Sequence, residues 1–241
     1  MKFFTQILIA AVAFTSASAE RGATRNSQQE NRKLPKSSSS DDGNFEKTLT
    51  LTVTNESFNQ PFGALFVMVH NDYAEPLYTR GKKASPELAR LAEDGSPAKL
   101  VEHYTDNNSG VGQVYAFNDG APYVGGEPFQ LKVDVSDEYP KVTIATMAIN
   151  TNDCFVSING AYLVPGVTLD LPGLDSGTEE NNELCISMPG PACATPDGNP
   201  NVASGNGEGF VHVHRGFFGI GDLPADRYDW RNPMMRVVVS N

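Results

Sequence analysis

Alternation of apolar and polar residues predicts several short β-strands. Between residues 48 and 54, Leu49, Leu51 and Val53 alternate with threonines, which is typical of a half-buried strand, so the folded domain is expected to begin here. The fuller apolar run over 64–70 suits a central strand. Similar patterns predict further strands over residues 129–135, 141–149, 155–158, 166–171, 210–214 and 235–239.

A single helix is well signalled after the second strand. Ser85 suits the N-cap, Pro86 the first helical position and Gly95 the stop, with Leu88 and Leu91 spaced to share one face. No strand alternates with a helix of crossover length, which disfavours a parallel sheet. The expected fold class is therefore all-β, an antiparallel β-sandwich of about eight strands with one or two short helices.

The first residues have the pattern of a secretory signal. Lys2 precedes an apolar run over 7–14, and Ala17, Ser18 and Ala19 form a small-x-small cleavage pattern. The run is shorter than the ~20 residues that a membrane-spanning helix needs, and no later segment reaches that length. We therefore expect a signal peptide over residues 1–19, a secreted, extracellular protein and no transmembrane segment.

Residues 20–46 are polar and include a serine tract over 37–40. Such a segment buries too little apolar surface to order itself, so a disordered Ser-rich linker is expected there. Residues 47–241 then form one domain.

The chain is acidic, with a formal net charge of -11 at pH 7. Removal of residues 1–19 takes away Lys2 and no acidic residue, so the mature protein is more acidic still. A negative surface repels phosphate backbones, so nucleic acid is not expected as a partner, whereas cations are natural partners.

Three cysteines lie in the second half of the chain, where an oxidising compartment would permit disulfides. Cys185 and Cys193 bracket a short Pro/Gly segment and are the favoured pair. Cys154 is then free, or alternatively it pairs with Cys185.

Acidic residues gather in loops that follow strands. Asp153 comes after the predicted strand over 141–149, and Asp175 and Glu179 lie four residues apart around Gly177. Carboxylates and loop carbonyls are the oxygen ligands that Ca²⁺ prefers. Spacing alone equally suits an exposed acidic loop in an acidic chain.

His212 and His214 form a second candidate site. The strand period of two places both imidazoles on one face, which suits a zinc or iron site, although a third ligand is not evident nearby. Hydrogen-bonded structural histidines are the other interpretation. No G-x-S-x-G elbow and no phosphate-binding glycine loop before a helix is present in the sequence.

Several of these segments, in this order, resemble the spondin domain, particularly its stand-alone single-domain members. The resemblance covers about residues 47–240, and its more specific parts are a D-x-G-T-[DE] loop and a late D-W-R-N-P. The segments concerned are residues 152–156, 175–179, 208–216, 228–233 and 236–239.

The resemblance implies an eight-stranded sandwich similar to C2 domains, with one Ca²⁺ at one end, as in secreted matrix and adhesion proteins. It implies that Asp153, Asp175 and Glu179 hold the ion. Two positions depart from the family pattern. Glu179 stands where animal members have Asp, which lengthens the arm, and Cys154 stands where an aromatic residue is common.

The resulting expectation is a secreted, calcium-binding recognition or adhesion domain without catalysis. Its ligand would be an extracellular protein, a glycan or another cell-surface component. The alternative is an extracellular metal-dependent enzyme that uses His212 and His214.

Overall fold

The computed structural model describes residues 47–106, 109–118, 121–195 and 201–241. The expected signal peptide (1–19) and Ser-rich linker (20–46) lie outside the described residues. Within the described part of the chain, no helix is both long enough and apolar enough to cross a membrane.

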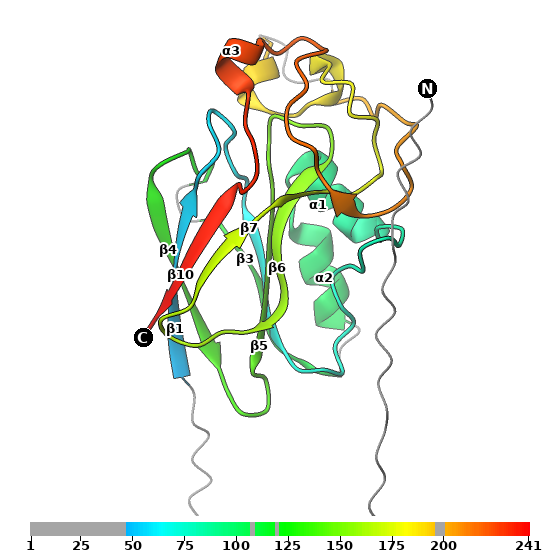
Figure 1. Ribbon diagram of the computed structural model, residues 1–241. Helices are drawn as coiled ribbons and strands as arrows, with labels where there is room; N and C mark the ends of the chain where they lie inside the picture. The colour runs from blue at the N-terminus through cyan, green and yellow to red at the C-terminus, as the bar shows by residue number, and fades with distance from the viewer. Residues whose placement is uncertain (1–46, 107–108, 119–120, 196–200) are drawn as a thin grey trace, which may run out of the picture. The chain divides into compact units, whose positions relative to one another are not determined.

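Two antiparallel sheets form the domain, as Figure 1 shows. In the first sheet the strand order is β4 (Pro128–Val135), β1 (Lys47–Asn55), β10 (Met235–Ser240) and β7 (Thr168–Leu171). In the second sheet the order is β3 (Val111–Phe117), β2 (Leu65–His70), β5 (Lys141–Met147), β6 (Cys154–Tyr162), β8 (Gly173–Asp175) and β9 (His212–Val213).

The main core lies between the two sheets and follows the alternation of apolar residues. Leu51 of β1 is fully buried, and so are Val237 of β10 and Val67 of β2, which belong to the same apolar cluster. The opposite face of the first sheet is exposed to solvent. This is seen at Val238, which is 39% exposed, whereas its neighbours Val237 and Val239 are buried. The expected all-β sandwich is confirmed.

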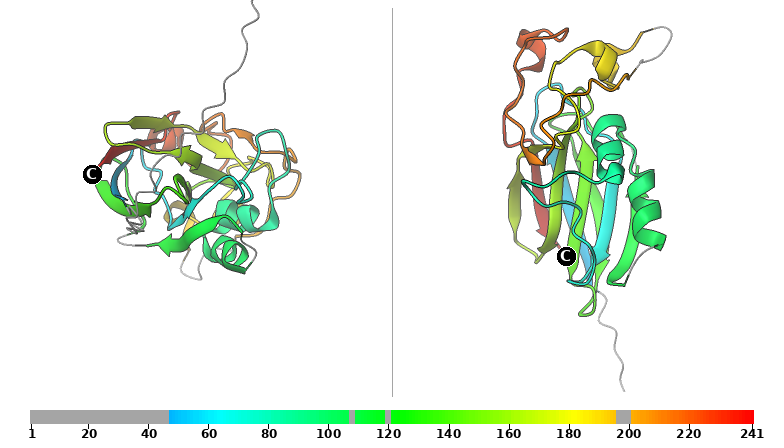
Figure 2. Two further views of the ribbon diagram at one scale, coloured as in Figure 1. Left: turned by 90° about the horizontal axis from the view of Figure 1, so that it is seen from below. Right: turned by 90° about the vertical axis from the view of Figure 1, so that its right-hand side faces the viewer.

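The second sheet is covered on its outer face by two helices, α1 (Pro86–Asp94) and α2 (Ala98–Asp106) (Figure 2). This covering explains why β2 is apolar throughout. Val67 and Val69 face the sandwich core, whereas Phe66 and Met68 join a second apolar cluster with the helices. A strand buried on both faces loses the polar alternation of an exposed sheet.

The helix α1 begins and ends as its sequence predicts. The Oγ of Ser85 accepts a hydrogen bond from the N–H of Leu88 at 3.1 Å. Gly95 adopts a left-handed conformation with φ +70°, and its N–H bonds to the carbonyl of Leu91. A second short helix was allowed for, but no residue range was predicted for α2, and strand β3 was not predicted.

The described residues contain ten strands rather than about eight, because β3 and the very short β8 have no counterpart among the predicted strands. Strand β8 has three residues, and the strand expected over 210–214 is reduced to His212–Val213. These pieces pair only with the first residues of β6 and with each other. A three-residue strand such as β8 carries too little alternation to stand out in a sequence.

Beyond β8 the chain forms loops, two 3₁₀ turns (Cys185–Ser187 and Pro191–Cys193) and the short helix α3 (Ala225–Tyr228). Figure 1 shows these yellow-to-orange segments at one end of the sandwich. The expected Cys185–Cys193 disulfide is confirmed, and Cys154 is a free thiol in the core.

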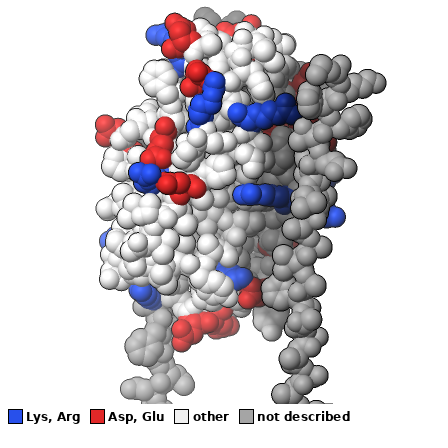
Figure 3. All heavy atoms as spheres, viewed as in Figure 1, with Lys and Arg blue, Asp and Glu red and all other residues white. Residues whose placement is uncertain are grey.

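Acidic and basic side chains are interspersed on the face drawn in Figure 3. The net negative charge does not form one acidic patch on that face. The carboxylates of Asp153, Asp175 and Glu179 are instead largely buried.

Candidate metal site

The candidate site lies where β6 begins and β8 ends. Asp153 directly precedes β6, and Asp175 is the last residue of β8. The two strands pair antiparallel, with Cys154 opposite Asp175. Since antiparallel neighbours run in opposite directions, the start of one and the end of the other meet at the same end of the sheet. Two of the three expected calcium ligands therefore lie side by side.

Asp153 is fully buried and organises the loop that follows β8. Its Oδ2 accepts hydrogen bonds from the main-chain N–H groups of Thr178 at 2.8 Å and Glu179 at 3.1 Å, and from the hydroxyl of Ser176 at 2.9 Å. Its Oδ1 is buried and has no hydrogen-bond partner among the described residues. Oδ2 of Asp153 thus holds the loop, and Oδ1 is available to bind a cation.

Gly177 allows this loop to fold tightly. It has φ +70°, and a Cβ atom here would lie 2.4 Å from the carbonyl oxygen of Phe210, so no other residue fits without moving the backbone. Its N–H donates to Oδ1 of Asp175 at 2.7 Å, and the Asn181 amide donates to Oδ2 of Asp175 at 2.6 Å. Asp175 therefore has a hydrogen bond on each oxygen.

Glu179 is only 3% exposed and turns back toward the site. Its Oε1 accepts a hydrogen bond from the N–H of Ser204 at 3.2 Å. Its Oε2 is buried without a hydrogen-bond partner in the described parts of the chain. Asp153 and Glu179 thus each present one buried, unsatisfied carboxylate oxygen, and such a group is costly unless a cation or a proton compensates it.

The electrostatics of the site favour a positive ligand. Burial raises the pKa of Asp175 to about 6, and the nearby charge of Asp153 adds to the rise. Burial likewise raises the pKa of Glu179 to about 7, helped by the charges of Glu93 and Asp153, and burial also raises the pKa of Asp153. Carboxylates that raise one another's pKa in this way repel each other when ionised, and a bound cation relieves that repulsion.

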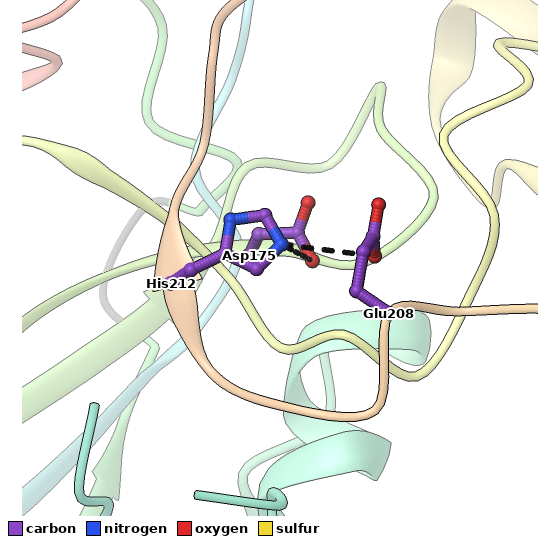
Figure 4. Close-up of side chains that lie close together, drawn as sticks. All are labelled: Asp175, Glu208 and His212. Carbon is purple, nitrogen blue, oxygen red and sulfur yellow. Dashed lines mark ion pairs between the residues drawn. The ribbon is translucent and has the colours of Figure 1, made fainter. Parts of the chain in front are cut away.

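A second set of ligand atoms converges on the outer side of Asp175 (Figure 4). The Nε2 atom of His212 lies 3.6 Å from Oδ1 of Asp175 and 3.7 Å from Oε2 of Glu208. Over the described ranges of the chain, these residues are the one group of three whose ligand atoms all lie within 4.8 Å of each other. Asp153 and Glu179 do not belong to it.

His214 does not join His212 as a ligand. It is 4% exposed, its Nε2 is bonded to Oδ1 of Asn181 at 2.9 Å, and its Nδ1 accepts the N–H of Gly216 at 3.0 Å. Burial lowers the pKa of His214 to about 3. With both ring nitrogens bonded inside the protein, this histidine matches the structural interpretation rather than a His212–His214 metal pair.

Two acidic residues near the site were not predicted from the sequence to be site residues. Glu93 projects from α1 toward Thr178, and burial raises its pKa. Glu208 lies in a glycine-rich segment that reads as a turn. The only signal for Glu208 was its spacing of four residues before His212.

The fold and the site together define an all-β sandwich with buried carboxylates at one end. A scan against models of protein families finds no match to this chain, and a search of curated proteins finds none either.

Proposed function

We propose that this protein is a secreted, non-catalytic domain that binds Ca²⁺ at the end of the sandwich and uses the loops there for recognition or adhesion. In this proposal Asp153, Asp175 and Glu179 supply carboxylate oxygens to the ion. It rests on the buried, unsatisfied oxygens Oδ1 of Asp153 and Oε2 of Glu179. The likeness to spondin domains described above supports the same assignment.

Calcium suits this site because its ligands are oxygens. Ca²⁺ takes six to eight oxygen ligands in flexible geometry, and the loops offer carbonyl groups besides the carboxylates. Extracellular calcium modules bind with Kd values of about 10⁻⁴–10⁻³ M, which three carboxylates suffice to reach. The ion would then add to the hydrogen bonds with which Asp153 already holds loop 176–179.

The competing function, an extracellular metal-dependent enzyme using His212 and His214, has less support. His214 has both ring nitrogens bonded within the protein, so a catalytic centre that needs both histidines would require the local hydrogen bonds to break. We therefore do not propose it.

The calcium assignment is tested by thermal melting and calorimetric titration of protein stripped with EDTA. We expect CaCl₂ to bind and to stabilise the wild-type protein, by about 2.7 kcal/mol at a concentration one hundred times Kd. The variant Asp153→Asn should lose most of this effect, whereas Glu127→Gln, which removes one exposed carboxylate, should keep it. Absence of calcium stabilisation in the wild type, or its persistence in Asp153→Asn, contradicts the assignment.

The recognition role has its own measurement. Immobilised protein is incubated with purified extracellular proteins and glycans, with CaCl₂ or with EDTA. We expect retention of a ligand that depends on CaCl₂ and that Asp153→Asn abolishes. Retention that is equal in EDTA would show that the loops at the calcium site do not form the binding surface.

A further inference from the structure

We propose that Asp175, Glu208 and His212 bind a second cation, a transition-metal ion such as Zn²⁺, whose remaining coordination position opens into an adjacent pocket. This site goes beyond the calcium-binding function and does not require calcium to be bound. It shares only Asp175 with the proposed calcium ligands.

The tautomer of His212 prepares Nε2 for a metal. Nδ1 lies 3.1 Å from the carbonyl oxygen of Val213, and because a carbonyl only accepts, Nδ1 carries the proton in the neutral ring. Nε2 then presents a lone pair. Metal-binding histidines commonly have this arrangement, with the other ring nitrogen donating to a carbonyl that fixes the ring.

The surroundings of that lone pair call for a cation. Nε2 is buried, has no hydrogen-bond partner among the described residues, and faces oxygens of Asp175 and Glu208. A nitrogen lone pair and two carboxylates repel one another unless a proton or a metal ion lies between them. At 3.6 and 3.7 Å the separations exceed those of N–H···O hydrogen bonds, so no direct bond to either oxygen offsets that repulsion.

The spacing agrees with tetrahedral coordination. Zinc binds nitrogen and carboxylate oxygen at about 2.0–2.2 Å, which places neighbouring ligand atoms of a tetrahedral site roughly 3.4 Å apart. The two separations from Nε2 are within a few tenths of an ångström of that value. An ion between these side chains therefore needs only small side-chain movements.

The nitrogen ligand separates this site from the calcium site. Calcium prefers oxygen ligands only, whereas imidazole is a preferred ligand of zinc, copper, iron and nickel. The side chain of His212 is 23% exposed, and that of Glu208 is 39% exposed, so an ion from solution can reach them. Asp175, at 1% exposure, supplies the fixed inner ligand.

A pocket of about 270 Å³ adjoins the three residues and supplies the open position. Its wall includes Arg215, Phe218 and Ile220, of which Ile220 is 68% exposed. Three protein ligands with a fourth position left for a small molecule are typical of accessible zinc sites. A metal ion and Arg215 together would bind the carboxylate group of a small molecule. Phe218 and Ile220 would pack against an apolar part of the same molecule.

The test uses full-length protein stripped with EDTA and titrated with CoCl₂ and ZnCl₂. We expect one Co²⁺ per chain with the visible absorption of a four-coordinate site, displaced by Zn²⁺ and shifted by added acetate. His212→Ala and Glu208→Gln should each weaken Co²⁺ binding at least ~10-fold, since even outer partners of metal ligands have effects of that size. His103→Ala, which removes a histidine on α2, should bind like the wild type.

Two measurements keep this result distinct from the calcium proposal. His212→Ala should retain the CaCl₂ stabilisation, which also shows that the variant folds. In the wild type, ZnCl₂ should shift the NMR signal of Nε2 of His212 and leave Nδ1 protonated. Failure of the wild type to bind Co²⁺ or Zn²⁺, or equal binding by His212→Ala, overturns the metal site, and an absorption spectrum that acetate does not alter overturns the open position.

Discussion

The main-chain N–H of Glu179 donates a hydrogen bond to Oδ2 of Asp153 across 3.1 Å. This contact joins the residue before β6 to the end of the loop that follows β8. It leaves Oδ1 of Asp153 and Oε2 of Glu179 buried without hydrogen-bond partners among the described residues. The same two residues therefore shape the loop and leave a place for a cation.

Loss of the Asp153 carboxylate should destabilise the domain even without metal. Asp153→Ala removes the acceptor of Thr178, Glu179 and Ser176, and hydrogen bonds to charged groups contribute about 1.5–3 kcal/mol each. Relief of the buried negative charge offsets part of this loss, so a net loss of roughly 1–3 kcal/mol in unfolding free energy is expected in EDTA. Denaturant unfolding measures it. Asp134→Ala, which removes an exposed carboxylate, is the control and should change stability by less than about 0.5 kcal/mol. Equal stability of the two variants would contradict the role of Asp153.

Glu183 is expected to hold the chain near the proposed second metal site. Its Oε1 and Oε2 accept the N–H groups of Phe218 at 2.6 Å and Ile220 at 2.9 Å. Glu183→Gln exchanges one acceptor for a donor, so hydrogen exchange at these two amides should accelerate, and the unfolding free energy should fall by roughly 1–3 kcal/mol. Glu180→Gln, at an exposed neighbour, should leave both amides protected. Unchanged exchange in Glu183→Gln would be the contrary result.

The two faces of β10 should differ sharply in their tolerance of truncation. Val237 is fully buried between the sheets, whereas Val238 is 39% exposed on the outer face. Val237→Ala should cost about 2 kcal/mol through lost burial and the cavity left behind, and Val238→Ala well under 1 kcal/mol. Urea unfolding of the pair measures the difference. Similar losses for both variants would mean that the register of β10 is not as described.

His70 should make the domain less stable as the pH falls. Burial lowers the pKa of His70, and Lys141 lowers it further, whereas the bond to the Asn71 carbonyl and the charge of Asp72 oppose the change. Because the folded pKa lies below the ordinary value, the unfolded chain takes up a proton first. This contribution is present above pH 6.5 and is lost as the pH falls from 6.5 toward the folded pKa.

The measurement is unfolding free energy in EDTA between pH 7 and 5. His70→Asn lacks the titrating ring, so its stability should fall less steeply than that of the wild type, by at most about 1.4 kcal/mol per pH unit. An NMR titration of the wild type should place the pKa of His70 below 6.5. Parallel pH profiles for the two proteins would show that His70 is not buried in its neutral form.

Local patterns in the sequence were sufficient for most of the fold. The alternation around Leu51 and Val237 predicts strands whose apolar faces are buried, and Ser85 and Gly95 predict the limits of α1. These features depend on residues that are close in the sequence. Side chains alternate between the two faces of a strand, and the hydrogen bonds that cap a helix involve residues only a few positions apart. The three-residue strand β8 escaped prediction because its pairing depends on β6 and β9 rather than on its own residues, and the strand expected over 210–214 is shortened to His212–Val213.

The sequence by itself determined the all-β class, the candidate carboxylates and the favoured disulfide. Only the tertiary structure decided which of the polar residues meet. Asp153 and Asp175 lie together because β6 and β8 pair in one register. Glu208 comes near Asp175 because the pairing of β9 with β8 places His212 opposite Asp175. Burial then leaves particular oxygen and nitrogen atoms without hydrogen-bond partners within the part of the chain that the structure describes. Burial and register arise from contacts between distant segments, so no local pattern of residues could have shown them.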